Sequence, residues 1–339
     1  MKKIILSCLL LITLFLTSCA TQSGYKSSNF FVMDTLAEVR VYNANASLDD
    51  IFSECKQLSQ MLENKISVSI EESDTVAFNA QMSHDFSSEF LELLSLSLDL
   101  SEYTNGCFDA TCGALISLWK TCESQNRLPT EQEIIDAKAA VGYSNIAMTD
   151  NVAVKNVPEL MLDFGAIGKG FAADKMAESL KKNGVECGMI SFVSSVTVFG
   201  EKDFNIGIRC PNTSGELCGY VSLKNQSLSV SGDYERFYEI GGERYPHILD
   251  PKTGQPAMGE IHSVAVIADC GVVADALSTA IFVMGIREAA ELYQKGELSF
   301  EFLCITDTDV VVSDGFFDNL NVTNADYRLI SVSQYLLEN

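Results

Sequence analysis

The sequence predicts an α+β fold, and two observations lead to this prediction. Apolar residues recur at helical spacing through much of residues 47–140, whereas short runs typical of strands predominate from residue 189 onward. Helix and strand patterns therefore do not alternate as they would in a doubly wound parallel sheet. About 310 residues follow an N-terminal leader, which is enough for one large domain or two closely packed lobes.

The N-terminus has the pattern of an exported lipoprotein. Two lysines precede an apolar run at residues 4–16, which has the length of a secretory signal and is short for a membrane-spanning helix. The residues Leu-Thr-Ser before Cys19 resemble the bacterial lipobox, although an ordinary signal peptide with an incidental Cys is the alternative. We expect a signal peptide at residues 1–18, a flexible tether at 19–29 and a domain at 30–335, lipid-anchored through Cys19 to the outer face of the cell membrane.

The charge and the cysteines exclude several classes of protein. A formal net charge of −23 argues against nucleic-acid binding and against electrostatic attraction to an anionic membrane. Of the 11 cysteines, Cys8 and Cys19 lie in the leader region, and the remaining nine form no C-x-x-C pair and have no His at zinc spacing. We therefore expect mostly free, buried thiols.

Helix caps and periodic patterns predict the elements in order. Ser47 and Ser87 precede amphipathic runs, Thr130 and Glu133 form a capping box, and Gly285 ends a helix. In the first half we expect strands at 36–42 and near 147, 154 and 161, helices at 47–61, 90–103 and 130–140, and a small-residue loop at 105–113. In the second half we expect strands at 189–193, 196–199, 204–208, 220–223, 227–231, 236–240 and 263–268, helices at 272–284 and 287–295, and a closing hairpin at 302–306 and 310–313.

A glycine-rich turn stands at residues 162–174. An apolar run at 160–162 reads as a strand that ends at Asp163, three glycines follow, and a helix pattern occupies 171–180. The free N–H groups and the dipole of a helix N-terminus favour an anion, and Lys169 adds a cation. The spacing matches neither the dinucleotide fingerprint nor a P-loop, so a purely structural turn is an equal alternative.

Two further groups of residues could carry chemistry. Asp275 and Thr279 lie four apart on one helix face, and their oxygens suit Mg²⁺. The alternative is an acid favoured near a helix start and a Thr that packs its methyl group. His247 stands at the end of a strand before a Pro-Lys-Thr-Gly turn, a position that favours function over packing.

In their order along the chain, these segments resemble the motifs of the ApbE family, the FAD:protein FMN transferases. The longest and most specific are His-Ile-Leu-Asp-Pro-Lys-Thr-Gly and Ala-Asp-Ala-Leu-Ser-Thr-Ala. The resemblance covers roughly residues 30–330. It implies a T-fold-like α+β architecture with two packed lobes and an FAD cleft between them. The matching segments are 33–35, 106–113, 162–174, 231–234, 247–254 and 274–280.

The resemblance also implies an activity and a set of site residues. FMN from FAD would be attached through a phosphoester bond to a Thr or Ser of a client flavoprotein, such as a membrane redox subunit, and AMP would be released. An FAD pyrophosphatase and a flavin-binding lipoprotein without turnover are the alternatives. Mg²⁺ would be held by the Ala166 backbone oxygen, Asp275 and Thr279, and His247 would transfer the proton. The residues expected to line the FAD site are Met33, Phe108, Asp109, Ala110, Asp163, Lys169 and Ile248.

One segment departs from the family pattern. Members usually carry Asn-x-Gly-Gly-Asn where residues 191–195 read Ser-Phe-Val-Ser-Ser, and Val193 lacks the freedom of a Gly to adopt positive φ. Two expectations about substitutions follow from the matched motifs. A side chain at Gly168 should block the FAD pyrophosphate, and Asp275→Ala should spare the fold because the residue opens onto a cleft.

Overall fold

The computed structural model describes residues 24–42, 47–80, 85–149, 152–211, 215–234, 236–317 and 319–338. Its centre is a nine-stranded sheet with the order β1-β2-β5-β6-β9-β12-β13-β14-β16, antiparallel throughout except for the parallel pair β14–β16. The strands are β1 (Tyr25–Val32), β2 (Thr35–Tyr42), β5 (Cys187–Ser191), β6 (Ser195–Phe199), β9 (Ser227–Gly232), β12 (Ser263–Ala268), β13 (Phe300–Ile305), β14 (Asp309–Val312) and β16 (Arg328–Ser331).

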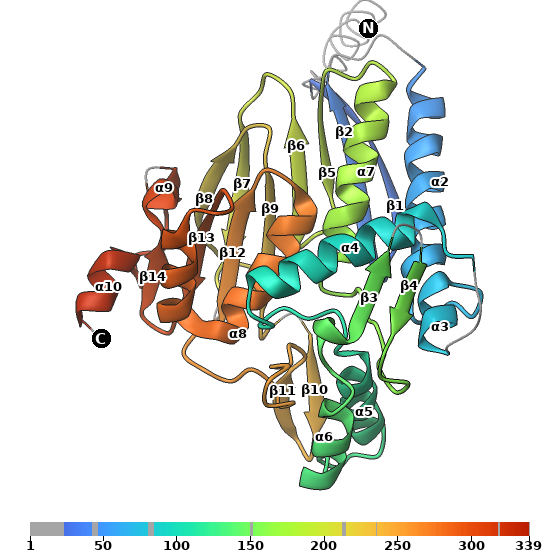
Figure 1. Cartoon of the computed structure of the whole chain (residues 1–339). Coiled ribbons are helices and arrows are strands. Elements are labelled where there is room, and N and C mark those ends of the chain that lie inside the picture. Colours follow the sequence, from blue (N-terminus) through green and yellow to red (C-terminus); the bar gives the residue numbers. More distant parts are fainter. Residues whose placement is uncertain are drawn as a thin grey trace, which may run out of the picture.

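Helices cover one face of this sheet and a smaller sheet covers part of the other (Figure 1). The covering helices are α2 (Leu48–Ile66), α4 (Ser88–Tyr103), α7 (Gly168–Lys182) and α8 (Gly271–Lys295), and the smaller sheet has the order β15-β8-β7. Its strands are β7 (Phe204–Arg209), β8 (Leu217–Leu223) and β15 (Leu320–Val322). The remaining elements of the main body are α3 (Asp74–Asn79), the hairpin β3 (Ile146–Thr149) and β4 (Val152–Lys155), a 3₁₀ turn (Tyr143–Asn145), α9 (Asp314–Phe317) and α10 (Val332–Glu338).

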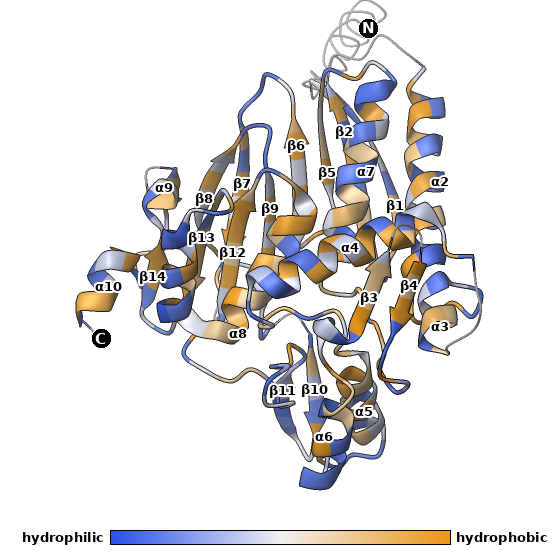
Figure 2. Cartoon of the chain, in the orientation of Figure 1, coloured by the Kyte–Doolittle hydropathy of each residue, from blue (hydrophilic) through white to orange (hydrophobic). Residues whose placement is uncertain are grey.

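Strand β12 shows why both faces of the main sheet are buried. Val264 and Val266 pack on the helix side, whereas Ala265 and Ile267 pack on the side of the smaller sheet. Because successive side chains in a strand point to opposite faces, a strand covered on both faces needs an apolar residue at every position. Figure 2 shows β12 as predominantly hydrophobic, in agreement with its central place in the sheet.

A small lobe extends from the main body. It consists of α5 (Gly113–Ser124), α6 (Glu131–Lys138) and the hairpin β10 (Phe237–Ile240) and β11 (Glu243–Pro246). Trp119 is at its centre, where the ring stacks on Tyr238 with centroids 5.7 Å apart and the indole N–H donates to the Gly254 carbonyl at 3.0 Å. This hydrogen bond ties α5 to the turn that follows His247 in the sequence.

Several local predictions are confirmed. Ser87 accepts a hydrogen bond from the Phe90 N–H, and the capping box of Thr130 and Glu133 is formed in both directions. Helix α8 breaks at Gly285, which has φ 83° and ψ 171°. The nine cysteines of the described residues are free thiols, and eight of them are buried. The α+β class is confirmed as well.

Other predictions are wrong in detail. The run at 160–162 forms no strand and contributes one isolated bridge between Met161 and Cys112. Residues 25–29, expected in the tether, belong to β1, because their backbone pairs with β2 from Tyr25 onward. Helix α5 directly follows the small-residue loop at 105–113, and the sequence predicted no bounds for it. The signal peptide and Cys19 lie outside the described residues, and within those residues no helix has the length and apolarity needed to cross a bilayer.

Candidate active site

A cavity of about 910 Å³ lies where the main body meets the small lobe. The small lobe contributes the face of α5 that carries Ile116, Lys120 and Glu123, spaced at helical intervals. The main body contributes the β5–β6 turn, β9, the start of α8 and the turn before α7. Of the eleven residues expected to form the site, nine line this cavity: Phe108, Asp109, Asp163, Ala166, Lys169, His247, Ile248, Asp275 and Thr279.

The N-terminal ends of α7 and α8 cross here at backbone contact distance. A Cβ on Gly170 would lie 2.1 Å from the carbonyl oxygen of Gly271. Each helix also supplies a carboxylate to the start of the other. Asp174 accepts from the N–H groups of Gly271 and Val272 at 2.7 and 2.9 Å, and Asp275 Oδ2 accepts from the Gly170 N–H at 2.6 Å. The two helix starts are therefore fixed relative to each other.

Donors surround the Asp275 carboxylate, which is only 3% exposed. Its Oδ1 accepts from the hydroxyls of Ser195 and Ser229 at 2.6 and 2.5 Å. Its Oδ2 accepts, among the described residues, from the Gly170 N–H alone. Each carboxylate oxygen has about two acceptor positions, so Oδ1 is saturated and Oδ2 keeps one position free. The carboxylate is thus held ready to offer one oxygen to a ligand in the cavity.

Hydroxyl groups connect Asp275 to Thr279 along the wall of the cavity. Ser229 lies 3.5 Å from Ser278, and Ser231 lies 2.8 Å from Ser278 and 3.4 Å from the Thr279 hydroxyl. Serines 229, 231 and 278 and Thr279 all line the cavity. The wall therefore presents one carboxylate and several hydroxyls, which are hard oxygen ligands.

The acidic and sulfur-containing side chains of the cavity do not cluster into a ready-made metal site. Within the described ranges, no three His, Cys, Asp or Glu side chains gather closely enough to hold a metal ion. A cation here would need oxygens of another kind, and Ala166 and Thr279 line the same cavity as Asp275. One carboxylate, one hydroxyl and one carbonyl form a sparse set that suits Mg²⁺, which keeps waters or phosphates as its remaining ligands.

His247 has its ring oriented by the backbone. Its Nδ1 lies 2.7 Å from the carbonyl oxygen of Arg236, and because a carbonyl can only accept, Nδ1 carries the hydrogen and Nε2 is left as an acceptor. Burial lowers the pKa of His247, and the nearby positive charges of Arg236, Lys169 and Lys120 lower it further, against the hydrogen bond to the carbonyl. The ring is therefore a neutral base near pH 7.

Cations on the cavity wall lack acidic partners. Lys120, Lys169, Arg209 and Arg236 line the cavity, and none of them forms an ion pair with a carboxylate in the part of the chain that the structure describes. In a chain of formal charge −23, a cavity lined by four cations beside four acidic residues, Asp109, Glu123, Asp163 and Asp275, is richer in positive charge than the chain as a whole. The unpaired cations favour an anionic ligand there.

Two carboxylates of the cavity have structural partners. Asp109 accepts from the N–H and the hydroxyl of Thr111 and from the Tyr143 N–H, at 2.9, 2.7 and 3.0 Å, and burial raises the pKa of its carboxyl. Asp163 Oδ1 accepts from the Gly165 N–H at 2.7 Å, which closes the turn before α7. Both side chains hold loops of the cavity wall in place.

Met33 and Ala110 do not line the cavity. The Met33 N–H donates to Glu63 at 2.8 Å in the β1–β2 turn, and the neighbouring cavity residue is Thr35. Ala110 is buried, and its carbonyl accepts from the Asp163 N–H at 2.8 Å. Both residues support the wall from behind.

Gly168 does not face the cavity, contrary to expectation. It is buried at the first position of α7, and a Cβ there would point at the side chain of Ile66, 3.1 Å from its Cδ1. The close backbone approach of this turn is made by Gly170, two residues later. The expectation failed because glycines two residues apart at a helix start point in different directions.

The β5–β6 turn carries an unusual backbone. Val193 has φ 66°, and the Phe192 N–H donates to the Ser195 carbonyl at 2.8 Å across the two-residue loop of Val193 and Ser194. The sequence indicated that a Val could not take the positive φ of a Gly, and the structure shows that it does. Positive φ is a true outlier for a β-branched residue.

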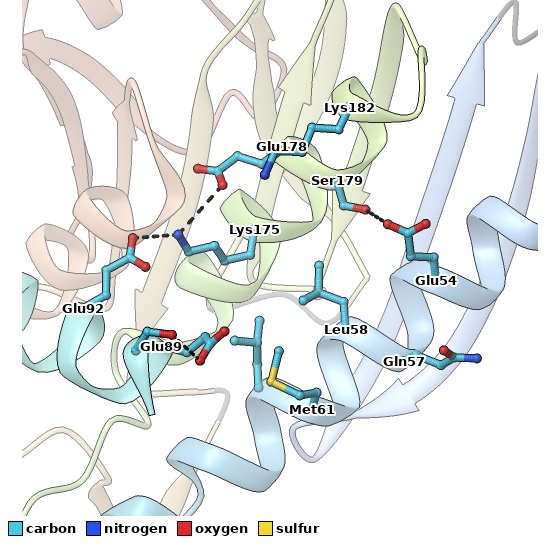
Figure 3. A pocket seen from close by; sticks show the side chains of 12 residues that line it. Glu54, Gln57, Leu58, Met61, Glu89, Glu92, Lys175, Glu178, Ser179 and Lys182 are labelled. Atoms are coloured by element: carbon cyan, nitrogen blue, oxygen red, sulfur yellow. Dashed lines mark hydrogen bonds and ion pairs between the residues drawn. The ribbon is translucent and has the colours of Figure 1, made fainter. Parts of the chain in front are cut away.

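A second cavity of about 570 Å³ lies between α2, α4 and α7 (Figure 3). Its polar side chains bind one another: Lys175 contacts Glu92 at 2.6 Å and Glu178 at 3.8 Å, and Ser179 donates to Glu54 at 2.6 Å. None of the residues expected to carry chemistry lines it. The larger cavity is therefore the candidate active site.

The fold and the cavity define a class of protein: an α+β sandwich with a small lobe and, between them, a cavity rich in oxygens and unpaired cations. The sequence profile of the ApbE family matches residues 33–303. This match spans most of the 339 residues, and the chain belongs to the ApbE family.

Individual relatives and a solved structure are similar to this chain over most of its length. An FAD:protein FMN transferase of Haemophilus influenzae is 28% identical over 347 residues, covering 95% of this chain and 99% of the relative. One from Treponema pallidum is 29% identical over 328 residues, covering 88% and 89%. The apo crystal structure of Pseudomonas stutzeri flavinyl transferase ApbE matches with a TM-score of 0.72 at 26% identity, over 83% of this chain and 91% of that chain. The expected ApbE architecture is confirmed.

Proposed function

We propose that this protein is a Mg²⁺-dependent FAD:protein FMN transferase that joins FMN to a Thr or Ser of a client flavoprotein and releases AMP. The observation that carries the proposal is the single cavity in which an oriented neutral His, a carboxylate with one free oxygen position and unpaired cations meet. Full-length relatives named as FAD:protein FMN transferases support the choice of reaction.

The cations and the turn before α7 would bind the FAD pyrophosphate. Lys120, Lys169 and Arg236 lie close enough to His247 to lower its pKa, so a phosphate held among them would lie beside the His ring. Unpaired cations in a partly enclosed site stabilise phosphate charge more strongly than they would in bulk water. This arrangement would place the scissile phosphoanhydride next to the base.

The transfer balances in one displacement. The client hydroxyl oxygen forms a bond to the FMN-side phosphorus, and the bond from that phosphorus to the bridging oxygen breaks. AMP leaves with the bridging oxygen, and the hydroxyl proton passes to Nε2 of His247, the free acceptor of the ring. Two other carboxylates of the cavity, Asp109 and Asp163, already accept hydrogen bonds from the loops that they close, which leaves His247 as the better placed base.

Mg²⁺ fits the donor set of the cavity. Asp275, Thr279 and the Ala166 carbonyl would hold it, and Oδ2 of Asp275 is the carboxylate oxygen with a free position. When bound, Mg²⁺ would supply charge neutralisation for the pyrophosphate. Ser195 and Ser229 keep Asp275 in the orientation that such binding requires.

The test uses purified protein, FAD and Mg²⁺, with and without a flavin-free acceptor domain of a membrane redox subunit. Client-dependent FMN labelling together with AMP supports the proposal. FMN and AMP without labelling would identify a pyrophosphatase, and FAD binding without turnover would identify a flavin-binding protein, so either result overturns it. His247→Gln should bind FAD and transfer nothing. His262→Gln is the matched control, because His262 pairs with Asp233 and Asp307 and does not line the cavity.

We also propose that the mature chain is exported and lipid-anchored at Cys19. The lipobox pattern supports this proposal. Wild-type protein should fractionate with membranes, and Cys19→Ala should be released or remain unprocessed. Recovery of soluble protein with an intact Met1 would contradict it.

A further inference from the structure

Three large apolar side chains stand exposed beside the candidate active site. Phe31 in β1 is 69% exposed, Leu36 in β2 is 52% exposed, and Val193 in the β5–β6 turn is 54% exposed. We call these three residues the apolar row. Each lies next to buried residues on the same strand or turn, so their exposure is not the fraying of a loose segment.

The strand register brings the apolar row to one end of the sheet. Phe31 is paired with Leu36 across the β1–β2 hairpin, and paired residues of antiparallel strands stand side by side on one face. The last β2–β5 pair is Glu38 with Ser191, and Val193 lies two residues beyond it in the β5–β6 turn, at the same end of the sheet as Leu36.

The apolar row is continuous with the active-site cavity. Val193 belongs to the row and also lines the cavity. A polypeptide that delivers a hydroxyl group to His247 must cross the rim of this cavity. Among the residues that line the cavity, Lys120 and Arg236 are charged, whereas Val193 is apolar and 54% exposed.

The backbone of Val193 gives an independent reason to assign a role to its side chain. In a two-residue hairpin loop, a first central position with φ above zero is usually occupied by Gly, because Gly adopts this conformation without a steric cost. Val193 has φ 66° and presents its side chain to solvent, so its methyl groups gain little from burial within this chain. A strained backbone conformation whose energetic cost is not offset by side-chain packing is typical of functional positions.

We propose that the apolar row is the docking surface for the client, and that it binds apolar side chains of the client segment that flanks the acceptor Thr or Ser. This inference rests on the proposed function. Glu38 and Arg40, also on β2, pair with each other at 2.7 Å, so neither charge is left to attract a charged partner. The segment would run over the row and enter the cavity at Val193.

The test compares transfer kinetics in solution with the flavin-free acceptor domain as the client. The double variant Phe31→Ser with Leu36→Ser should raise the KM for the client at least tenfold, while the Kd for FAD, measured by flavin fluorescence, stays within twofold. Leu337→Ser is the matched control, because Leu337 is 89% exposed on α10 and should behave as wild type.

Each outcome decides a separate point. Client kinetics within twofold of wild type in the double variant would overturn the docking surface and leave the proposed function standing. A defect that appears only when phosphatidylglycerol vesicles are present would assign the row to the membrane and also overturn it. Wild-type protein that binds FAD and labels no client would overturn the proposed function, and the docking surface with it.

Discussion

Gly170→Ala should destabilise the protein because no space exists for one methyl group. The new Cβ would lie 2.1 Å from the oxygen and 2.3 Å from the carbon of the Gly271 carbonyl, which is backbone and cannot rotate away. Ala for Gly inside a helix gains about 1 kcal/mol of helix propensity. Overpacking costs about 1–3 kcal/mol. Separation of the helices would also weaken the 2.6 Å bond from the Gly170 N–H to Asp275, and a bond to a charged group contributes about 1.5–3 kcal/mol.

The balance of these contributions is a loss of about 3 kcal/mol. For a chain of this size that corresponds to a fall in Tm of about 4–5 °C, which thermal unfolding followed by circular dichroism would detect. Gly168→Ala is the matched control, two residues earlier on the same helix. Its Cβ meets only the end of the Ile66 side chain, at 3.1 Å, and its Tm should stay within about 2 °C of wild type. Equal Tm values for the two variants would refute the reasoning.

Three further predictions use the same helix starts and the strained turn. Burial raises the pKa of Asp174 to about 6, so the native state binds its proton more readily than the unfolded state. As pH falls from 7 to 4, the wild type should therefore gain up to about 3 kcal/mol relative to Asp174→Asn, measured by urea unfolding at each pH. The expectation that Asp275→Ala spares the fold is wrong, because Asp275 is only 3% exposed and two hydroxyls and one N–H would lose a buried acceptor. The variant should lose at least about 3 kcal/mol of stability and abolish Mg²⁺-dependent turnover, and unchanged urea unfolding would contradict this. Val193→Gly should raise stability by about 1 kcal/mol through relief of positive φ, and a lower Tm would disprove the strain.

Local sequence signals predicted much of the fold. The capping box at Thr130, the cap at Ser87 and the break at Gly285 depend on residues within a few positions, and the structure confirms each one. The strand at 263–268 has the predicted bounds because every residue in it is buried. The run at 160–162 is also apolar, with Leu160 and Leu162 fully buried, yet it forms one isolated bridge, between Met161 and Cys112. An apolar run in the sequence predicts that its side chains are buried, but it does not predict which strand, if any, its backbone pairs with.

In the candidate site as well, some residues could be predicted from the sequence, whereas others are brought together only by the fold. The residue patterns singled out Lys169, His247, Asp275 and Thr279, and the resemblance to the ApbE family implied the other five of the nine expected residues that line the cavity. The partners of Asp275 were missed, because Ser195 and Ser229 lie 80 and 46 residues away and meet it only through the adjacency of β6 and β9. Lys120 gave no motif signal. Only the position of α5 beside the cavity brings it near His247.

The reciprocal carboxylates of α7 and α8 affect how relatives of this chain should be interpreted. Asp275 accepts three hydrogen bonds that hold α7, β6 and β9 together. A related protein that had lost its catalytic activity would therefore still need Asp275 in order to fold. The presence of this carboxylate in a relative is therefore weak evidence that the relative is an active enzyme. His247 contacts the rest of the chain mainly through one carbonyl, and its loss would cost the fold little. When a genome carries several copies of such a chain, the imidazole is the better marker of the copies that still turn over substrate.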